Sequence, residues 1–291
     1  RSVFYANCIL GNDEHEAVLE ITQSPHRFLF LQDTIVAFTG GGLQPQLKNQ
    51  LLPLYQPVFI PADAMIECKQ QTPGFRLYMA VAGGFKADEF LNSHSTDLPV
   101  KAGGHHGRPL KKEDLLQIKN HLTGVQKNLF VILKSGATIK LNIQPPVFTT
   151  SPIRVIHGIE WNYLNDLSKE IIASAKFKVS PQSNRMGYRL KGEALETDQP
   201  CEIISSAVTQ GTVQLTSSGE MIVLMADAQT VGGYPRIAQV CTVDLPLLAQ
   251  KKPGDEIQFQ FISLQEAEEL YLSDIEQLNT IKQTLQQLYA G

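Results

Sequence analysis

The sequence predicts a mainly β protein with a few helices, arranged as two related β-barrel lobes followed by a C-terminal helix. Short apolar segments bounded by Gly, Pro, Asn and Asp recur along the chain, as is typical of strands joined by turns. A set of motifs also repeats in order in the two halves, and the chain closes with a helical stripe. We therefore expect lobes at 1–150 and 151–262, and a helix at 263–291.

Apolar segments in both halves have the length and the flanking turn residues of strands. In the first half they are 27–32, 34–41, 58–62, 76–84 and 129–133, with helical candidates at 43–52 and 111–122. In the second half a helical stripe over 159–175 follows Gly158 and opens the lobe. The strands expected after it are 176–180, 211–215, 221–225, 238–243 and 256–262.

The last segment has the clearest helical pattern. Ser263 and Glu266 have the spacing of a capping box at a helix start. The apolar stripe that follows comprises Leu264, Ala267, Tyr271, Ile275, Leu278, Ile281, Leu285 and Leu288. We expect this helix to pack on its own lobe, with a partner interface along its near-heptad tail as the alternative.

The repeat supports two related lobes. AVAGGF at Ala80, TDLP at Thr96 and GRPLKKED at Gly107 are followed in the same order by TVGGYP at Thr230, VDLP at Val243 and QKKPGDE at Gln250. Both copies have a strand, a glycine pair, an Asp-Leu-Pro motif and a basic turn before an acidic residue. Duplication of one ancestral unit is the simplest explanation.

Composition excludes several classes of partner. Apolar residues make up 43% and charged residues 19% of the chain, and the net charge is −4 without a Lys/Arg-rich run. We therefore expect no nucleic acid and no membrane as partners, since the apolar runs are also too short to span a bilayer. The scattered Cys8, Cys68, Cys201 and Cys241 are expected to be reduced, mostly buried thiols in a cytoplasmic protein.

Two arginines in SNRMGYRL are candidate ligand-binding residues. Asn184, Arg185 and Arg189 lie around one glycine, and an i, i+4 pair in a strand shares a face. A guanidinium binds a carboxylate through two parallel hydrogen bonds. Salt bridges to nearby acidic residues are the structural alternative.

Glycine pairs follow apolar strands in both halves. Glycine lets backbone N–H groups approach a ligand closely, although a simple turn is the favoured interpretation of Gly83-Gly84. Around Gly232 and Gly233, the polar groups of Gln229, Thr230 and Tyr234 suit recognition of an amide.

His105 and His106, with Arg108, lie in the glycine-rich loop AGGHHGRP. No carboxylate or cysteine stands at a known ligand spacing, so we expect exposed loop histidines that contact substrate, and no metal. The chain has no P-loop, no GxGxxG after a strand, no GxSxG and no Met-Lys dipeptide for biotin attachment. If ATP or biotin is involved, another protein must therefore bind the nucleotide or carry the biotin.

Several segments together resemble the carboxyltransferase-related family that includes the 5-oxoprolinase C subunit, KipA, the allophanate hydrolase subunit 2 domain and part of urea carboxylase. They are ANCILGN at Ala6, LEIT at Leu19, LYMAVAGGF at Leu77, STD at Ser95, GRPLKKEDLL at Gly107, SNRMGYRLKG at Ser183, QTVGGYPRIAQV at Gln229, DLPLLAQ at Asp244 and KPGDEIQF at Lys252. The resemblance implies cyclophilin-like lobes. It also implies a substrate site that includes Asn184, Arg185, Arg189, Gln229, Thr230, Gly232, Gly233 and Tyr234.

The resemblance implies a hydrolase: the C subunit of an ATP-dependent 5-oxoprolinase that converts 5-oxo-L-proline to L-glutamate together with an A subunit, and with a KipI-like B subunit. The substrate would be a small amide or lactam. One alternative is a biotin-dependent carboxyltransferase acting on urea or another small amide. Another is a KipA-like regulator that binds a KipI-type kinase inhibitor. The catalytic base stays unassigned.

Two departures from the family pattern stand out. Family members carry a TVQDLGR-like segment before ANxLxGN, so a stretch of their N-terminal part is expected to be missing here. Glu113 stands where the family usually has Gly, and we expect this to alter the turn.

Overall fold

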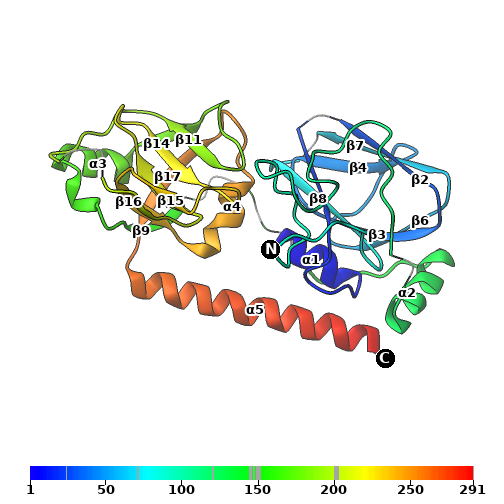
Figure 1. Ribbon diagram of the computed structural model, residues 1–291. Coiled ribbons are helices and arrows are strands. Elements are labelled where there is room, and N and C mark those ends of the chain that lie inside the picture. Colours follow the sequence, from blue (N-terminus) through cyan, green and yellow to red (C-terminus); the bar gives the residue numbers. More distant parts are fainter. Residues whose placement is uncertain are drawn as a thin grey trace. The chain divides into compact units, whose positions relative to one another are not determined.

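The computed structural model describes residues 1–291 except 24, 71, 120, 144, 145, 147, 149–151, 200–202 and 291. The described residues form 17 strands and five α-helices, which confirms the mainly β prediction (Figure 1). They divide into two compact units, 1–147 with 278–291, and 148–277. The expected lobe boundary at 150/151 lies outside the described residues.

The first unit contains two four-stranded sheets, with strand orders β1-β8-β3-β6 and β2-β7-β4-β5. Its strands are β1 Leu19–Thr22, β2 His26–Phe30, β3 Thr34–Gly40, β4 Leu43–Leu47, β5 Gln50–Leu51, β6 Pro57–Ile60, β7 Ala64–Gln70 and β8 Arg76–Val81. Helices α1 Ser2–Ile9 and α2 Gly124–Lys134 accompany them.

Strand β3 shows why this unit has two hydrophobic cores. Successive side chains of a strand point to opposite faces of the sheet. Ile35 and Ala37 pack in one core with α1 and α2, whereas Val36 and Phe38 pack in the other core. Both faces are covered, so every residue of β3 is buried, which explains its unbroken apolar sequence.

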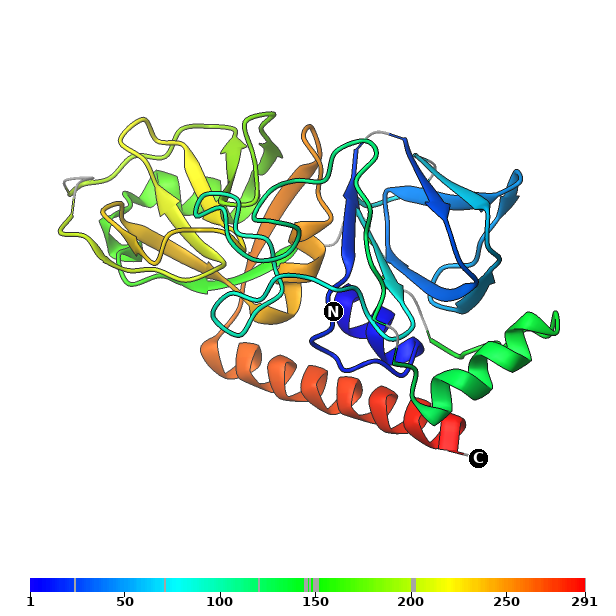
Figure 2. The ribbon, with the colours of Figure 1, turned by 45° about the vertical axis from the view of Figure 1, so that its right-hand side comes forward.

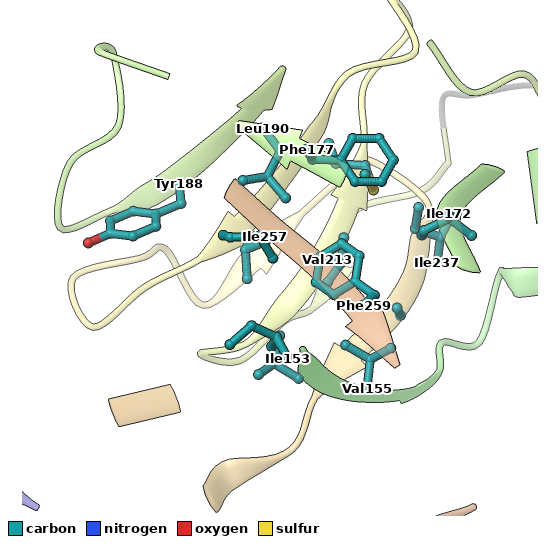
Figure 3. Packing of buried hydrophobic residues seen from close by; sticks show 14 of the residues in the cluster. Ile153, Val155, Ile172, Phe177, Tyr188, Leu190, Val213, Ile237, Ile257 and Phe259 are labelled. Carbon is teal, nitrogen blue, oxygen red and sulfur yellow. The ribbon is translucent and has the colours of Figure 1, made fainter. Parts of the chain in front are cut away.

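The second unit is a closed barrel with strand order β10-β11-β14-β13-β16-β9-β17. Side chains such as Phe177, Val213 and Phe259 fill its interior (Figure 3). The barrel strands are β9 Ile153–His157, β10 Lys176–Val179, β11 Gly187–Lys191, β13 Thr212–Leu215, β14 Met221–Leu224, β16 Arg236–Val240 and β17 Glu256–Phe261. A separate ribbon pairs β12 Ser206–Ala207 with β15 Val231–Gly232.

One strand prediction and two helix predictions need correction. Segment 129–133, predicted as a strand, lies in α2, where Thr123 and Gln126 form a capping box that starts the helix at Gly124. Segment 43–52 forms β4 and β5 instead of a helix, because β4 pairs with both β5 and β7 in one sheet. The described part of 111–122 is a loop.

The helix expected over 159–175 is shorter than the apolar stripe indicated. A 3₁₀ turn at Trp161–Tyr163 comes first, and α3 Asp166–Ser174 begins only after Asn165, whose Oδ1 accepts the N–H of Ser168. The side-chain cap therefore fixes the start of the helix. A second 3₁₀ turn, Thr242–Asp244, precedes α4 Leu245–Ala249.

Helix α5, Leu264–Ala290, is continuous, as Figure 2 shows in orange and red. Ser263 and Glu266 form the expected capping box, with reciprocal bonds of 2.8 and 3.2 Å. Its last turns belong to the first unit, because the Tyr289 hydroxyl donates to the Ile9 carbonyl at 2.5 Å and Leu285 is buried in that core. The expected packing on the second lobe alone is therefore wrong.

The three described cysteines, Cys8, Cys68 and Cys241, are buried free thiols. Burial raises the pKa of Cys8 to about 11 and that of Cys68 to about 12. Cys201 lies outside the described residues. The described helices include none with the length and hydropathy required to cross a bilayer.

Candidate functional site

Asn184 shapes the turn that leads into β11. Its Oδ1 accepts the N–H groups of Met186 at 2.8 Å and Gly187 at 3.2 Å, and its own N–H donates to the Gly187 carbonyl. Such local side-chain bonds are typical of Asn in turns. Arg185 therefore lies in the turn and not in the strand, so the expected i, i+4 strand geometry with Arg189 is wrong.

Arg185 forms an ion pair with Asp227. Its Nε and Nη2 donate to the two carboxylate oxygens of Asp227 at 2.8 and 3.0 Å. The Asp227 N–H also donates to the Arg185 carbonyl at 2.9 Å. A substrate carboxylate would have to replace Asp227 to receive the same two hydrogen bonds.

Arg189 has a different environment. It lies on β11 between the buried Tyr188 and Leu190, so its side chain faces away from the barrel interior and is exposed. Within the described part of the chain, no hydrogen bond or ion pair engages its guanidinium. Of the two arginines in SNRMGYRL, Arg185 is therefore paired with Asp227, whereas Arg189 has no ion pair among the described residues.

The remaining predicted residues of this unit lie on or beside the ribbon formed by β12 and β15. Gln229 and Thr230 are exposed just before β15, and Tyr234, just after it, is 38% exposed. Gly232 pairs with Ser206, and the Gly233 carbonyl accepts the Ile203 N–H at 3.1 Å. The QTVGGYP motif is therefore a surface strand connected to its neighbour by backbone hydrogen bonds.

Beneath the ribbon lies a residue that the sequence did not single out. Gln214 on β13 is 1% exposed, and its Nε2 has no hydrogen-bond partner among the described residues. A Cβ built on Gly232 would lie 2.5 Å from this Nε2. In sequence, Gln214 alternates with the core residues Val213 and Leu215, a pattern that indicates an outward-facing polar residue and gives no signal for the ribbon that covers it.

Arg236, from the same motif, anchors the ribbon. Its Nε and Nη2 donate to the two oxygens of Glu160 at 2.9 and 2.7 Å, and its Nη1 donates to the Ala207 carbonyl at 3.1 Å. The hydrogen bond from Arg236 holds the pKa of Glu160 below its usual value. Gly158 must lack a side chain because its Cβ would lie 2.1 Å from the Arg236 carbonyl oxygen.

His105, His106 and Arg108 belong to the first unit. Arg108 donates to both oxygens of Asp114 at 2.7 and 2.8 Å and holds the pKa of Asp114 well below its usual range. His105 Nε2 lies 3.6 Å from the same carboxylate and has a side chain only 20% exposed, whereas His106 is 70% exposed. The expectation of exposed histidines thus fits His106 better than His105.

The motifs at Ala6 and Ala80 meet in a buried amide network. Asn12 Oδ1 accepts the N–H of Gly83 at 2.9 Å and the Nε2 of Gln126 at 2.8 Å. Its Nδ2 donates to the Asn7 Oδ1 at 3.0 Å and to the Val81 carbonyl at 2.9 Å. The glycine pair of the first unit is thus a turn with φ angles of 84° and 83° at Gly83 and Gly84, as the sequence favoured.

The basic turn of the repeat has the same structure in both units. The N–H of Lys111 donates to the Asp114 carboxylate at 2.7 Å, and the N–H of Lys252 donates to Asp255 at 3.0 Å. The third residue has positive φ in both turns, 73° at Glu113 and 91° at Gly254. Glu113 thus adopts the positive φ that Gly254 adopts at the equivalent position of the second unit.

Two cavities, of about 260 and 190 Å³, are found in the described part of the chain. Neither is lined by any of the eleven predicted site residues. Among the described residues, no group of three or more His, Cys, Asp or Glu side chains is arranged to hold a metal ion.

Comparison with known proteins places the chain in a family. The family model for the carboxyltransferase domain, subdomains A and B, matches residues 1–261. The 5-oxoprolinase C subunit of Haemophilus influenzae is 34% identical over 278 residues, which are 94% of this chain and 85% of that protein. The urea amidolyase of Saccharomyces cerevisiae is 28% identical over 283 residues, which are 91% of this chain but 15% of that protein.

A solved structure shows the same fold. The crystal structure of the K. lactis urea amidolyase superposes with a TM-score of 0.83 at 24% identity, covering 96% of this chain and 18% of that chain. The family match and the similarity to the Haemophilus influenzae protein both extend over most of the residues, and the fold agrees with them. The chain therefore belongs to the carboxyltransferase domain family, subdomains A and B.

Proposed function

We propose that this chain is the C subunit of an ATP-dependent 5-oxoprolinase, which hydrolyses 5-oxo-L-proline to L-glutamate in a complex with an A subunit, and with a KipI-like B subunit. The observation that carries the proposal is the 34% identity to the Haemophilus influenzae 5-oxoprolinase C subunit over 94% of this chain and 85% of that protein. A role in an enzyme complex also fits the relationship to urea amidolyase.

The nucleotide would bind to one of the other two proteins of the complex. Phosphate groups bind at helix N-termini that offer free backbone N–H groups. The N-termini of α2, α3 and α5 are instead capped by their own Thr123, Asn165 and Ser263 side chains. The sequence also has no P-loop, so we assign no step of ATP chemistry to this chain.

The role of this chain would be to bind and orient the substrate. 5-Oxoproline carries a carboxylate and a lactam carbonyl, and both are hydrogen-bond acceptors. Arg189 is the guanidinium available for the carboxylate, since Arg185 is engaged with Asp227. A charged hydrogen bond of this kind contributes about 1.5–3 kcal/mol.

Reconstitution of the three-protein complex tests the proposal. Formation of glutamate from 5-oxoproline and ATP is expected only when all three proteins are present. Arg189→Ala should lower kcat/KM about 10- to 100-fold. Lys191→Ala is the matched control, because Lys191 lies two residues further on the same exposed face of β11. Absence of turnover in the complete mixture would refute the proposal.

The similarity to urea amidolyase favours one alternative: a biotin-dependent carboxyltransferase acting on urea or another small amide. Biotin would be carried by another protein, because this chain has no Met-Lys dipeptide. Carboxylation of urea by the chain in the presence of a carboxybiotin carrier, without ATP-dependent glutamate formation, would favour this function over the first.

A further inference from the structure

Gln214 is a buried polar side chain with an unpartnered donor. It is 1% exposed, and in the part of the chain that the structure describes its Nε2 has no hydrogen-bond partner. A buried donor without an acceptor costs free energy that an apolar side chain of the same shape would avoid. A feature of this kind in a folded protein calls for a role other than stability.

A β-bulge lies at this residue. Val213 pairs with Ala238, but Gln214 pairs with Arg236, so Ile237 is an extra residue on β16. A bulge redirects neighbouring side chains, and bulges are frequent next to binding sites. Gln214 and Arg236 lie directly opposite each other, so their side chains project from the same face of the ladder.

The ribbon contributes a second unpartnered polar atom. Ser206 lies directly opposite Gly232, and opposed residues of antiparallel strands project to the same face. The Cβ position of Gly232 is directed at Gln214 Nε2, so the Ser206 side chain faces Gln214 as well. The Ser206 Oγ is buried and also lacks a hydrogen-bond partner within the described residues.

We propose that Gln214 and Ser206 form a subsite beneath the ribbon that binds an oxygen acceptor of the substrate, the carbonyl of a lactam or amide or one carboxylate oxygen. The Gln214 amide and the Ser206 hydroxyl donate to this oxygen. Because Gly232 has no side chain, the Gln214 Nε2 can lie directly beneath the ribbon, where a Cβ would come within 2.5 Å of it. This subsite rests on the proposed function and deepens it, because it assigns the groups that recognise the small amide.

Entry of the ligand requires the ribbon to lift from the barrel. Each ribbon strand has only two residues, and Val231 beside Gly232 is 55% exposed. The bond from Arg236 to the Ala207 carbonyl fastens the ribbon at one end. Arg236 therefore acts as a positioning residue, since its guanidinium is already paired with Glu160.

The side-chain amide resonance of Gln214 provides a direct test. The full-length chain, labelled with ¹⁵N-glutamine, is titrated with 5-oxoproline, urea and acetate in separate experiments. Gln214→Leu identifies the resonance by its disappearance and should raise the Kd of the bound probe at least about tenfold. It should also leave Tm unchanged or raise it, because the unpartnered donor is removed. Gln258→Leu, at an exposed position on β17, is the control.

The outcomes separate this subsite from the proposed function. A Gln214 shift with 5-oxoproline, lost affinity in Gln214→Leu and weak binding in Gly232→Ala support both. Binding of urea alone, with the same mutational pattern, supports the subsite and argues against 5-oxoproline as substrate. If the Gln214 amide resonance shifts with no probe, or if Gln214→Leu binds as the wild type does, the subsite is overturned. Gln214 Nε2 and Ser206 Oγ would then be hydrogen-bonded to buried water.

Discussion

The two glycine pairs of the repeat have become different structures. In the first unit, Gly83-Gly84 forms a turn whose N–H is bound by the amide of Asn12. In the second unit, Gly232 lies in a surface ribbon over the unpartnered amide of Gln214. The first pair is thus held by a satisfied polar network, whereas the second covers polar atoms without a hydrogen-bond partner in the described part of the chain.

The contacts that hold the two glycine motifs in place, here called their anchors, differ in the same way. A neutral amide network fixes the glycine turn of the first unit, and a charged pair, Arg236 with Glu160, fixes the ribbon of the second. The basic turns, by contrast, keep the same hydrogen bonds in both units. The glycine motif of the first unit is thus part of a satisfied polar network, whereas that of the second unit covers the subsite proposed above.

The largest expected effect is at the charged anchor. Arg236→Ala leaves Glu160, which is 7% exposed, as a buried carboxylate without its main partner. We expect a loss of about 3 kcal/mol in the free energy of unfolding, measured by denaturant titration. Arg185→Ala is the comparison, since that pair is more exposed and should cost less than about 1 kcal/mol. Equal losses of unfolding free energy in Arg236→Ala and Arg185→Ala would contradict the distinction between a buried and a more exposed ion pair.

Asn12→Ala tests the neutral anchor. It removes the acceptor of the Gly83 N–H and a partner of Asn7, both inside the first unit. The free energy of unfolding should fall by about 2 kcal/mol. Asn128→Ala, at an exposed position on α2, should change it by less than about 0.5 kcal/mol. A neutral Asn12→Ala would mean that the network does not stabilise the turn.

The shared turn predicts a smaller effect. Gly254→Ala places a Cβ at φ 91° and should cost about 1 kcal/mol. Glu113→Gly at φ 73° relieves the same strain but increases the entropy of the unfolded chain, so the two effects nearly cancel. We expect a change within about 0.5 kcal/mol from thermal unfolding. If Glu113→Gly lost as much stability as Gly254→Ala, Glu113 would not carry this backbone strain, and the two turns would not be equivalent.

The smallest effect concerns pH. Because the folded protein lowers the pKa of Glu160 from 4.5, ionised Glu160 contributes stability above that value. This contribution is lost as the pH falls through the lowered pKa. The Tm difference between the wild type and Glu160→Gln should therefore shrink below pH 4.5. The deficit of Asn12→Ala should stay constant over the same range, since no ionisable group is removed.

Local patterns predicted the elements that depend on local chemistry. The strands at Thr34 and Met221 and the Ser263–Glu266 cap were recognisable from periodicity and spacing alone. Segment 129–133 was not, because an apolar run of that length suits a strand or a buried helix, and the Thr123 cap decided between them. For the same reason, the turn that removes Arg185 from β11 could not be predicted.

The sequence by itself determined a mainly β chain, the repeated motifs, and the residues Arg185, Arg189 and Gly232 as candidates. Only the tertiary structure decided which arginine is already paired, and that Gln214 is buried beneath the ribbon. Burial and pairing depend on residues far apart in the chain, such as Gln214 with Gly232 or Arg236 with Glu160. Local periodicity carries no record of such contacts, because they arise only when the barrel closes and the ribbon covers it.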